Sequence, residues 1–539
     1  MRKKKIFSII FLSEIGLCLI LNACVHHQKY PLDPYRHSPA ERKKQINDSA
    51  STPLLIHSKS EKRPEKRINT QGFSSLTLQS ALQMAIENNP AFQSDRLEPE
   101  INQAEVALQE AVFDPVLSGS LTAEDSSGAN DAKNEISKEM ANGNSIKTDF
   151  YLKKLFPAGS TLELGLGGSR ERTGDDAENA YNDMGLEATL IQPLLRGRGS
   201  EVNLASLHIA RLDFEISIHE LRGSAETLIT QVELAYWDYF LAKQSIEIYE
   251  NSLELAQQGV EEVQERILVG EIAPTELVAA EAEAATRKEQ LIVARNTLAK
   301  QRMNLIRLLG VMNGGAAVWD RELCLKDTPE PVSCRLKKVE EFVKSALKNR
   351  ADLNQARLQL EQNDLEVIRT RNGLLPKLDL FIMLGGSRYA NSFSDLDDKD
   401  GAIASYAVGI NFETPLGNRR PQAEHKVTVL SKKQAQIALS NMESLIQVDI
   451  RSAYVDVESA DERVKATSIT RKLRDKTFNI EQEKFRVGKS TAFLVSQAKR
   501  DMVASQISEI EAIVEYRKSL SNLYRMAGLA LNQWGITIK

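Results

Sequence analysis

The chain has 539 residues, a formal net charge of −5 and 42% hydrophobic residues, few of which are aromatic. This charge gives no bulk attraction to nucleic acid, so we expect no nucleic-acid partner. With seven histidines and no Walker loop, HExxH motif or G-x-S-x-G motif, the sequence favours a protein that is not an enzyme and holds no metal or other cofactor.

The N-terminus has the features of a bacterial export signal. A basic segment at residues 2–5 precedes a mostly apolar stretch at residues 6–21, which is short for a transmembrane helix. The letters LNAC at residues 21–24 resemble a lipobox. We therefore expect residues 1–23 to be a lipoprotein signal peptide and Cys24 to carry the lipid. An ordinary signal peptide or an uncleaved anchor is the alternative.

The residue after Cys24 is Val25 rather than Asp. By the usual sorting pattern of such lipoproteins, this predicts delivery to the outer membrane. Residues 24–74 are polar, contain Pro, Lys and Ser, and show no apolar periodicity. We expect them to form a flexible tether between the membrane lipid and the folded body.

Two short helices are predicted next. Thr77 suits the N-cap position of a helix that ends near Asn88. Pro90 suits the first turn of a second helix, which would run to about Val112 and kink at Pro99.

After Pro115 the apolar period changes from about 3.6 to 2, which predicts strands. Apolar residues alternate with polar or small ones in four segments of residues 116–193 and in two segments of residues 377–414. Transmembrane β-barrel strands have this pattern, although a half-buried sheet of a soluble protein gives it too. The position of the strands, after an export signal and between very long helices, favours the barrel.

Two very long helices are predicted from the spacing of the prolines. None occurs between Pro193 and Pro274 or after Pro421. This leaves residues 203–269 and 422–486 as helices of roughly 100 Å each. Helices of this length are stable only when they pack against other helices.

Each long helix ends at a Val-Gly pair, at residues 269–270 and 487–488. Glycine just past the last helical turn ends a helix. Thr275 or Thr491 can then cap a helix that runs back. We therefore expect two helical hairpins, each with a long and a shorter helix side by side.

The chain contains an internal duplication. Residues 85–117 match residues 346–378 without a gap, and residues 235–310 match residues 453–528. The offset falls from 261 residues in the first match to 218 in the second, so the first copy carries an insertion, which holds an extra strand pair near residues 146–169. A unit of roughly 200 residues is too long for a solenoid repeat, so we expect two copies of one half-domain.

The duplication predicts how the folded body is divided. Repeat 1 covers residues 75–310, with strands at about 116–193 and a hairpin tip near 270–275. Repeat 2 covers residues 340–530, with strands at about 377–414 and a tip near 488–491. A connecting equatorial segment (311–339) lies between them, and a C-terminal tail (531–539) follows. Cys324 and Cys334 lie in the connecting segment and are a disulfide candidate in an oxidising periplasm, with two free thiols as the alternative.

Several loose motifs occur together in a specific order. They are Leu76-Thr77-Leu78, Asn89-Pro90, Gln192-Pro193-Leu194-Leu195, Ala235-Tyr236-Trp237-Asp238 and the two Val-Gly turns. With the duplication, they make the chain resemble the TolC-type outer-membrane efflux proteins, in their lipoprotein branch, over about residues 75–530.

The resemblance implies an α+β membrane protein built from two internal repeats. Three chains would pool their strands into one transmembrane β-barrel, joined to a long periplasmic α-helical barrel. Such a homotrimer is the passive outer-membrane channel of a tripartite efflux or type I secretion system. Its partners would be a periplasmic adaptor protein and an inner-membrane pump of the RND or ABC type.

The resemblance also implies roles for the hairpin tips. The residues expected to contact the adaptor are Val269, Gly270, Glu271, Val487, Gly488 and Lys489. In the best-known member of the family, two carboxylates beyond the second tip narrow the closed entrance. The matching positions here, counted from Gly488, are Leu494 and Gln497. We therefore expect no carboxylate gate of that kind at this tip.

Three carboxylates on the polar side of the predicted strands, Glu163, Glu187 and Glu413, are candidates for the channel lumen. A simple wetted wall without a substrate site is the alternative. The number of strands also stays open. Two strands per copy would give twelve in a trimer, and the six strand-like segments of this chain would give eighteen if all of them lie in the barrel.

Two other functions share the lipoprotein start and the long helices. A periplasmic adaptor would need one hairpin flanked by lipoyl-like and small barrel domains, rather than two duplicated long helices. A structural coiled-coil lipoprotein would not need the alternating strands.

Overall fold

The computed structural model describes residues 76–128, 141–173, 180–311, 323–329, 336–390 and 402–537. They belong to one unit of the chain, residues 68–539. The expected signal peptide, the lipid site at Cys24 and the tether lie outside the described residues, as does Cys334. The predicted divisions at those places stay predictions.

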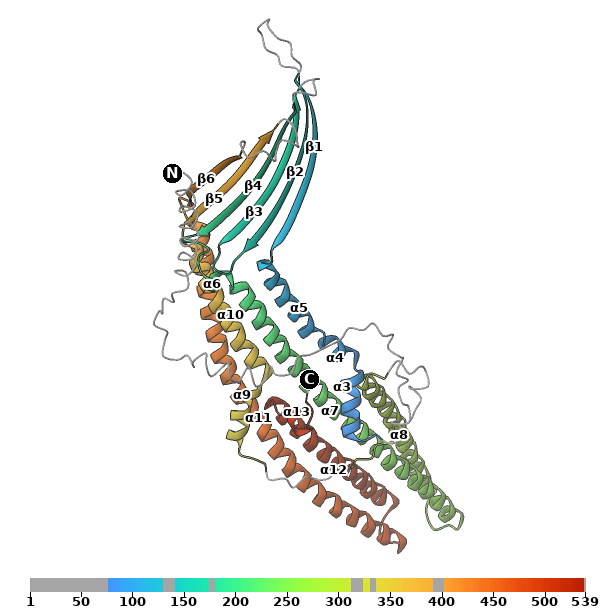
Figure 1. Cartoon of the computed structure of the whole chain (residues 1–539). Coiled ribbons are helices and arrows are strands. Elements are labelled where there is room, and N and C mark those ends of the chain that lie inside the picture. The colour runs from blue at the N-terminus through green and yellow to red at the C-terminus, as the bar shows by residue number, and fades with distance from the viewer. Residues whose placement is uncertain are drawn as a thin grey trace. The chain divides into compact units, whose positions relative to one another are not determined.

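Six long strands form one antiparallel sheet, in which each strand pairs with the next along the chain (Figure 1). They are β1 (Val116–Gly128), β2 (Ala141–Leu155), β3 (Thr161–Thr173), β4 (Ala180–Pro193), β5 (Lys377–Ala390) and β6 (Ala402–Glu413). The first repeat contributes four strands and the second contributes two. The six predicted strand segments are therefore confirmed, and the assignment of β2 and β3 as the extra pair of the first repeat stays a prediction.

The register brings most of the apolar residues of the six strands onto one face. Leu117 of β1 lies opposite Leu152, which lies opposite Leu164 of β3. Across the other strands, Leu164 is followed by Ala188, Leu384 and Tyr406. Because successive side chains of a strand point to opposite faces, the polar and small residues share the second face with a few larger apolar ones, Ile191, Phe381 and Met383.

Short helices connect the sheet to the long hairpins. They are α3 (Leu78–Asn88), α4 (Pro90–Asp95) and α5 (Glu98–Glu110) in repeat 1, and α9 (Val339–Asn349) and α10 (Ala351–Gly373) in repeat 2. Thr77 caps α3 as predicted, because its side chain accepts a hydrogen bond from the backbone N–H of Ser80.

The single kinked helix predicted over residues 90–112 is wrong. The chain leaves α4 at Arg96, starts α5 at Glu98 and ends in a 3₁₀ turn, η2 (Ala111–Phe113). Pro99 lies in the first turn of α5, where its missing N–H is tolerated, but it cannot continue the hydrogen bonds of α4. The corresponding helix α10 has no proline and is continuous.

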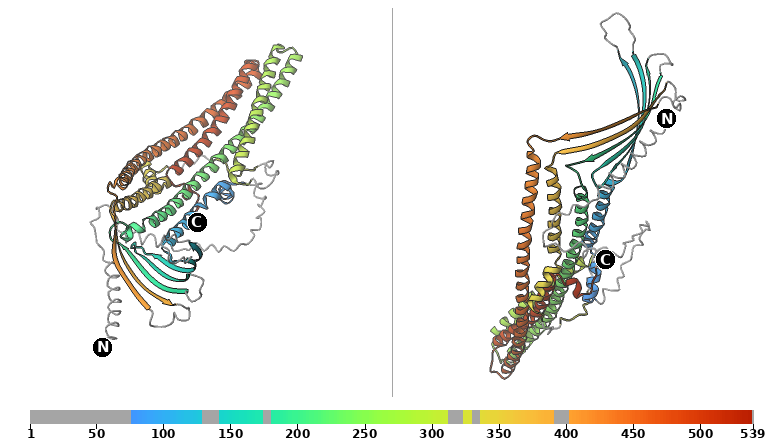
Figure 2. Two further views of the ribbon diagram at one scale, coloured as in Figure 1. Left: turned by 90° about the horizontal axis from the view of Figure 1, so that it is seen from above. Right: turned by 60° about the vertical axis from the view of Figure 1, so that its left-hand side comes forward.

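Two hairpins of long helices make up the rest. They are α7 (Ala205–Leu268) with α8 (Thr275–Leu309), and α11 (Arg419–Arg486) with α12 (Ala492–Met526). With 64 and 68 residues, α7 and α11 are about 96 and 102 Å long. Short helices α6 (Ser200–Asn203) and α13 (Ala530–Gln533) precede α7 and follow α12. The two hairpins run side by side to the end farthest from the sheet (Figure 2).

The caps of the hairpins differ slightly from expectation. Thr491 caps α12 by accepting a hydrogen bond from the backbone N–H of Leu494, as predicted. Thr275 is instead the first residue of α8, and Pro274 occupies the cap position. Helix α11 begins three residues before the predicted start, because Pro421 fits within its first turn, where no N–H is needed.

The described residues form two apolar cores, the first of which also includes Val514 of α12. The first lies around Tyr236, Trp237 and Ile229 of α7 and includes Leu82 of α3. The second lies around Ile450 of α11 and includes residues of α9 and α12. Within the described ranges, no helix combines the length and apolar character that crossing a membrane would require.

Candidate functional site

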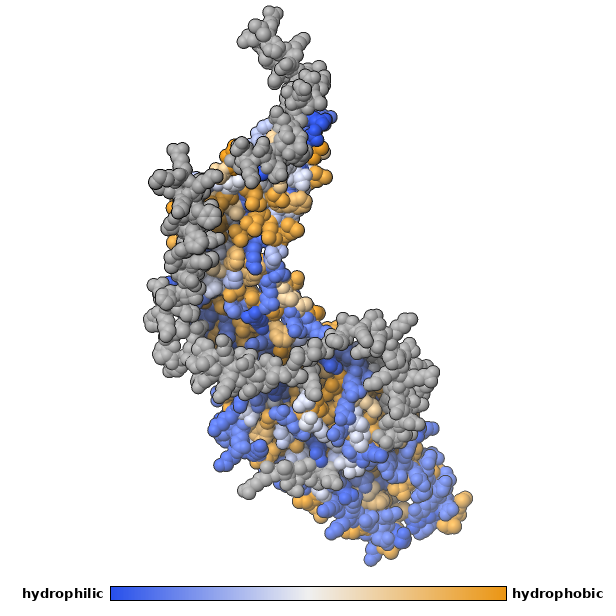
Figure 3. Space-filling view, viewed as in Figure 1, coloured by the Kyte–Doolittle hydropathy of each residue, from blue (hydrophilic) through white to orange (hydrophobic). Residues whose placement is uncertain are grey.

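The apolar face of the sheet is exposed in the single chain. Leu121 of β1 is 75% exposed and Tyr406 of β6 is 84% exposed. Leu166, Leu186 and Val408 are exposed as well. Figure 3 shows hydrophobic residues gathered on the strands, while the hairpins are mostly hydrophilic. An apolar surface that extends over a whole sheet marks contact with a membrane or another protein.

The three lumen candidates share the opposite face of the sheet. Glu163 of β3 pairs with Thr189 of β4. Glu187 lies on β4 as well, two residues before Thr189. The carboxylate of Glu187 accepts a hydrogen bond of 2.9 Å from the Thr189 hydroxyl. Glu413, at the end of β6, lies 3.9 Å from the guanidinium of Arg196.

This polar face does not form a discrete binding site. Much of its centre is glycine: Gly165, Gly167, Gly185, Gly385 and Gly409. In the part of the chain that the structure describes, no three His, Cys, Asp or Glu side chains are grouped to hold a metal ion. The face is a mostly polar wall of small side chains and scattered charges, with a few apolar side chains such as Phe381 and Met383, and such a wall suits contact with water.

The two hairpin tips have the same backbone construction. Gly270 and Gly488 have φ angles of 78° and 72°, in the left-handed region that favours glycine. At the first tip, the N–H of Glu271 donates to the carbonyl of Arg266 over 2.9 Å, and at the second, the N–H of Lys489 donates to that of Lys484 over 2.8 Å. Both hydrogen bonds close the last helical turn.

The same tips expose apolar side chains. Val269 is 78% exposed and Val487 is 65% exposed. Glu271 beside them forms an ion pair with Arg266 at 3.1 Å. The guanidinium of Arg266 also lies over the ring of Phe485, 4.6 Å from its centroid. This contact joins α7 to α11, so the two tips are neighbours.

A buried ionic cluster joins the hairpins farther from the tips. The carboxylate of Glu283 on α8 accepts hydrogen bonds from Arg287 at 2.6 Å and from Arg500 of α12 at 2.9 Å. Arg287 is only 3% exposed. Lys499 is buried nearby. Burial, with a smaller contribution from the charge of Arg287, lowers the pKa of the Lys499 ammonium to about 8.

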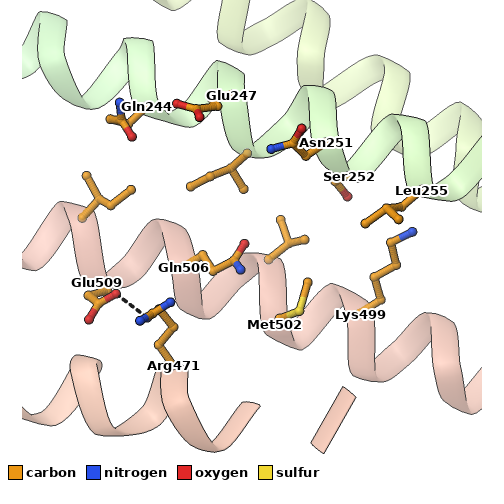
Figure 4. Close-up of a pocket in the computed structure, with 13 residues that line it drawn as sticks. Gln244, Glu247, Asn251, Ser252, Leu255, Arg471, Lys499, Met502, Gln506 and Glu509 are labelled. Atoms are coloured by element: carbon orange, nitrogen blue, oxygen red, sulfur yellow. Dashed lines mark ion pairs between the residues drawn. The ribbon is translucent and has the colours of Figure 1, made fainter. Parts of the chain in front are cut away.

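Lys499 also lines a cavity of ≈ 330 Å³ between α7, α11 and α12. Figure 4 shows it reaching from α12 toward Leu255 of α7, with an ion pair between Arg471 and Glu509 at the other end of the cavity. That ion pair measures 2.6 Å and joins α11 to α12. Polar contacts thus bridge the helices at several levels of the hairpins.

The structure separates the predicted site residues into two groups. The six tip residues lie at the ends of the hairpins, and the three glutamates lie on one face of the sheet. Leu494 and Gln497 are exposed near the second tip. Cys324 is exposed, and its bond with Cys334 stays a prediction because the second cysteine is outside the described residues.

The ionic cluster around Glu283 was not predicted. Its only signal in the sequence is a Glu and an Arg four residues apart on α8, a spacing that is common on exposed helix surfaces.

Comparisons with known proteins agree with this geometry. The family model "Outer membrane efflux protein" matches residues 153–311 and 342–529. The outer membrane efflux protein BepC of Brucella suis biovar 1 (strain 1330) is 22% identical over 443 residues, which cover 82% of this chain and 83% of BepC.

Solved structures show the same fold. The CmeC outer membrane channel of Campylobacter jejuni has a TM-score of 0.64 at 15% identity, with 94% of each chain covered. The open state of the MtrE outer membrane channel of Neisseria gonorrhoeae has a TM-score of 0.61 at 15% identity, with 84% of this chain and 89% of MtrE covered. Since the family model covers more than half of the sequence and both of its repeats, the chain belongs to the outer membrane efflux protein family.

Proposed function

We propose that this protein is a passive export duct, in which three copies pool their strands into one outer-membrane barrel and their helices into a periplasmic tunnel. The observation that carries the proposal is the exposed apolar face, which stays in register across all six strands. The strands have 12 to 15 residues, more than the roughly 9–11 that a transmembrane strand needs.

The hairpins supply the second part of the duct. Helices of about 100 Å reach far beyond a bilayer of roughly 40–45 Å. The hairpin tips, with Val269-Gly270-Glu271 and Val487-Gly488-Lys489, would then lie deep in the periplasm and receive an adaptor protein. Their exposed valines and nearby charges suit a partner with a mixed apolar and polar surface.

Transport energy would come from an inner-membrane pump of the RND or ABC type, with which the duct is linked through the adaptor. Glu163, Glu187 and Glu413 would face the water-filled lumen. Lipid on Cys24 would tether the chain to the outer membrane.

Conductance in a planar bilayer tests this proposal, after the mass of the purified protein in detergent has been measured. We expect a trimer that gives discrete conductance steps. The matched control is a variant with Leu121→Asp and Val408→Asp, which places charges on the lipid-facing side and should abolish insertion. A protein that stays monomeric and never conducts would refute the duct and would require a soluble role for the sheet.

A further inference from the structure

The six strands are staggered, so that the sheet is a parallelogram rather than a rectangle. The register places Val116, the first residue of β1, level with Ala407 of β6, and β6 continues six residues beyond that level to Glu413. At the other end, Ala402 of β6 lies level with Leu121, and β1 continues seven residues to Gly128. At each end of the sheet one edge strand thus projects beyond the other, so β6 is shifted as a whole along the strand direction relative to β1.

This stagger sets the tilt of the strands. Five strand spacings of about 4.8 Å and a displacement of six residues, each rising about 3.3 Å, incline the strands by about 40°. Closed barrels have strand tilts of about 35–45°, because closure requires a fixed stagger between neighbouring strands. The sheet of one chain therefore already has the geometry of a barrel segment from β1 to β6.

All six strands also carry the lipid-facing pattern. The exposed apolar residues include Leu117 and Phe150 on β1 and β2 as well as Val408 and Phe412 on β6. If β1 and β2 lay outside the wall, their apolar side chains would face water. Within the described residues, β1 and β6 each have only one neighbouring strand. A lipid-exposed edge would leave backbone N–H and C=O groups without partners, which a bilayer does not permit.

We propose that β6 of one copy pairs with β1 of the next, so that three copies close a barrel of eighteen strands. This inference rests on the proposed trimeric duct and specifies its wall. The two edge strands run in opposite directions, as antiparallel pairing requires. The strand that pairs with each edge comes from a second copy of this chain. Both edge strands, β1 and β6, carry the same alternation of apolar and polar residues, and their ends are displaced by the same stagger.

The alternation restricts the register of the new pair. The apolar side chains of the lipid-facing row have odd numbers on β1, as in Leu117 and Leu121, and even numbers on β6, as in Val408 and Ile410, and both rows must face the lipid. If the start of β1 in one copy is level with the end of β6 in the other, Val116 lies opposite Glu413. Leu121 then lies opposite Val408. The next permitted register, shifted by two residues, places Leu121 opposite Ile410.

The strand number determines the width of the exit. Barrel diameter grows roughly linearly with strand number, and barrels of about 16–18 strands enclose an aqueous channel. Eighteen strands would make the exit about 1.5 times as wide as twelve strands would. The barrel would then not limit the size of the exported molecule, and the size limit would lie in the helical part.

Disulfide cross-linking tests the pairing directly. In a Cys324→Ser, Cys334→Ser background, we would oxidise the outer-membrane protein carrying Leu121→Cys with Val408→Cys or Leu121→Cys with Ile410→Cys. We expect covalent dimers and trimers from one of these pairs. Leu121→Cys with Ala407→Cys is the matched control, because these two side chains face opposite sides of the sheet and should not cross-link.

A competing wall of twelve strands would contain β3 to β6 only. In that arrangement level strand ends place Thr161 opposite Glu413, so Leu164→Cys of β3 would cross-link with Ile410→Cys of the next copy, and neither β1 pair would react. That result in a conducting trimer would overturn the eighteen-stranded barrel while leaving the duct intact. Failure to form trimers or to conduct would count against the duct itself.

Polymer exclusion measures the width. Neutral polymers of increasing size would be added to the extracellular side of the channel in a planar bilayer. A variant lacking residues 129–179, with a short turn from β1 to β4, keeps the antiparallel order and should close with twelve strands. We expect the largest polymer radius that enters to fall by about one third in this variant. Equal exclusion limits in two conducting trimers would contradict the proposal.

Discussion

Glycine is needed for different reasons at the tips and at the end of α8. At Gly488 an added Cβ would meet no atom within 4 Å, so Gly488→Ala costs only the strain of the left-handed backbone, about 1 kcal/mol. At Gly310 the same atom would lie 2.3 Å from the carbonyl oxygen of Asn88, in addition to the positive φ. We expect Gly310→Ala to destabilise the protein by more than twice as much as Gly488→Ala.

Thermal unfolding of the purified variants, followed by circular dichroism, checks this order. A Gly310→Ala variant as stable as Gly488→Ala would show that α3 and α8 are not in contact as the structure places them.

Lys499 predicts a pH dependence of stability. Its ammonium is charged in the folded and unfolded chain below pH 8, so the cost of its burial is then fully present, about 2 to 3 kcal/mol. Because the folded-state pKa is lowered from 10.5 to about 8, the folded chain loses the proton first as the pH rises. Stability therefore increases between about pH 8 and 10.5.

We expect Lys499→Met to raise the melting temperature at pH 7. It should also weaken the increase of stability between about pH 8 and 10.5. Lys476→Met, on the exposed side of α11, is the control and should change neither. Melting curves at pH 7, 8, 9 and 10 decide the matter. An unchanged or lower melting temperature for Lys499→Met at pH 7 would mean that the ammonium is well solvated.

At the scale of single residues, the sequence predicted backbone roles better than buried charges. The Val-Gly pairs were recognisable because only glycine readily takes the left-handed turn that ends a helix. Glu283 and Arg287 were not recognisable, because their burial depends on α12 packing against α8. Nothing in the local sequence says which face of a long, mostly polar helix will be covered.

At the scale of elements, the ion pair between Glu283 and Arg500 predicts how strongly the hairpins hold each other. Glu283→Gln would leave the guanidinium of Arg287 buried with no carboxylate, which costs about 3 kcal/mol. Arg500 is 43% exposed, so Arg500→Gln should cost less than about 1 kcal/mol. Thermal unfolding and hydrogen exchange in α8 and α12 would measure both.

Hydrogen exchange separates a local from a global effect. We expect faster exchange on both α8 and α12 in Glu283→Gln, because the same carboxylate binds residues of both helices. Faster exchange confined to α8 would show that the link to α12 contributes nothing.

The elements themselves were predictable to different degrees. Alternation located all six strands, but several are longer than the alternating segments. Strand β1 ends in the sequence Glu124-Asp125-Ser126-Ser127, which has no apolar residue, so the alternation that signals a strand disappears there. The break between α4 and α5 was missed because Pro99 was interpreted as a kink, whereas the proline starts a new helix.

At the scale of the whole molecule, the proposed duplication would explain why the described part of the chain has two cores and two tips. Ala235 and Ala453, which correspond in the two repeats, are both buried, each in the core of its own repeat. The sequence alone could not show whether the alternating strands belong to a soluble sheet. The exposed apolar face of a complete sheet and the family match resolve that ambiguity in favour of an outer-membrane protein.

The proposed protein has two attachments to the membrane. A lipid on Cys24 and a barrel of transmembrane strands act independently, because the tether of residues 24–74 separates them in sequence. A closed barrel is held in the bilayer by the whole apolar face of its strands, with or without a lipid. We therefore expect Cys24→Ser to lose incorporation of labelled fatty acid but to remain in the outer-membrane fraction as a trimer.

Membrane fractionation and native mass measurement test this, with Ser51→Ala in the tether as a control that keeps both the lipid and the trimer. If Cys24→Ser instead accumulated as a soluble monomer, the lipid would be the only effective attachment. The apolar face of β1 to β6 would then need a partner other than the bilayer, and the barrel would be refuted together with the duct. Retention of the trimer without lipid would leave the strands as the part of the chain that holds it in the membrane.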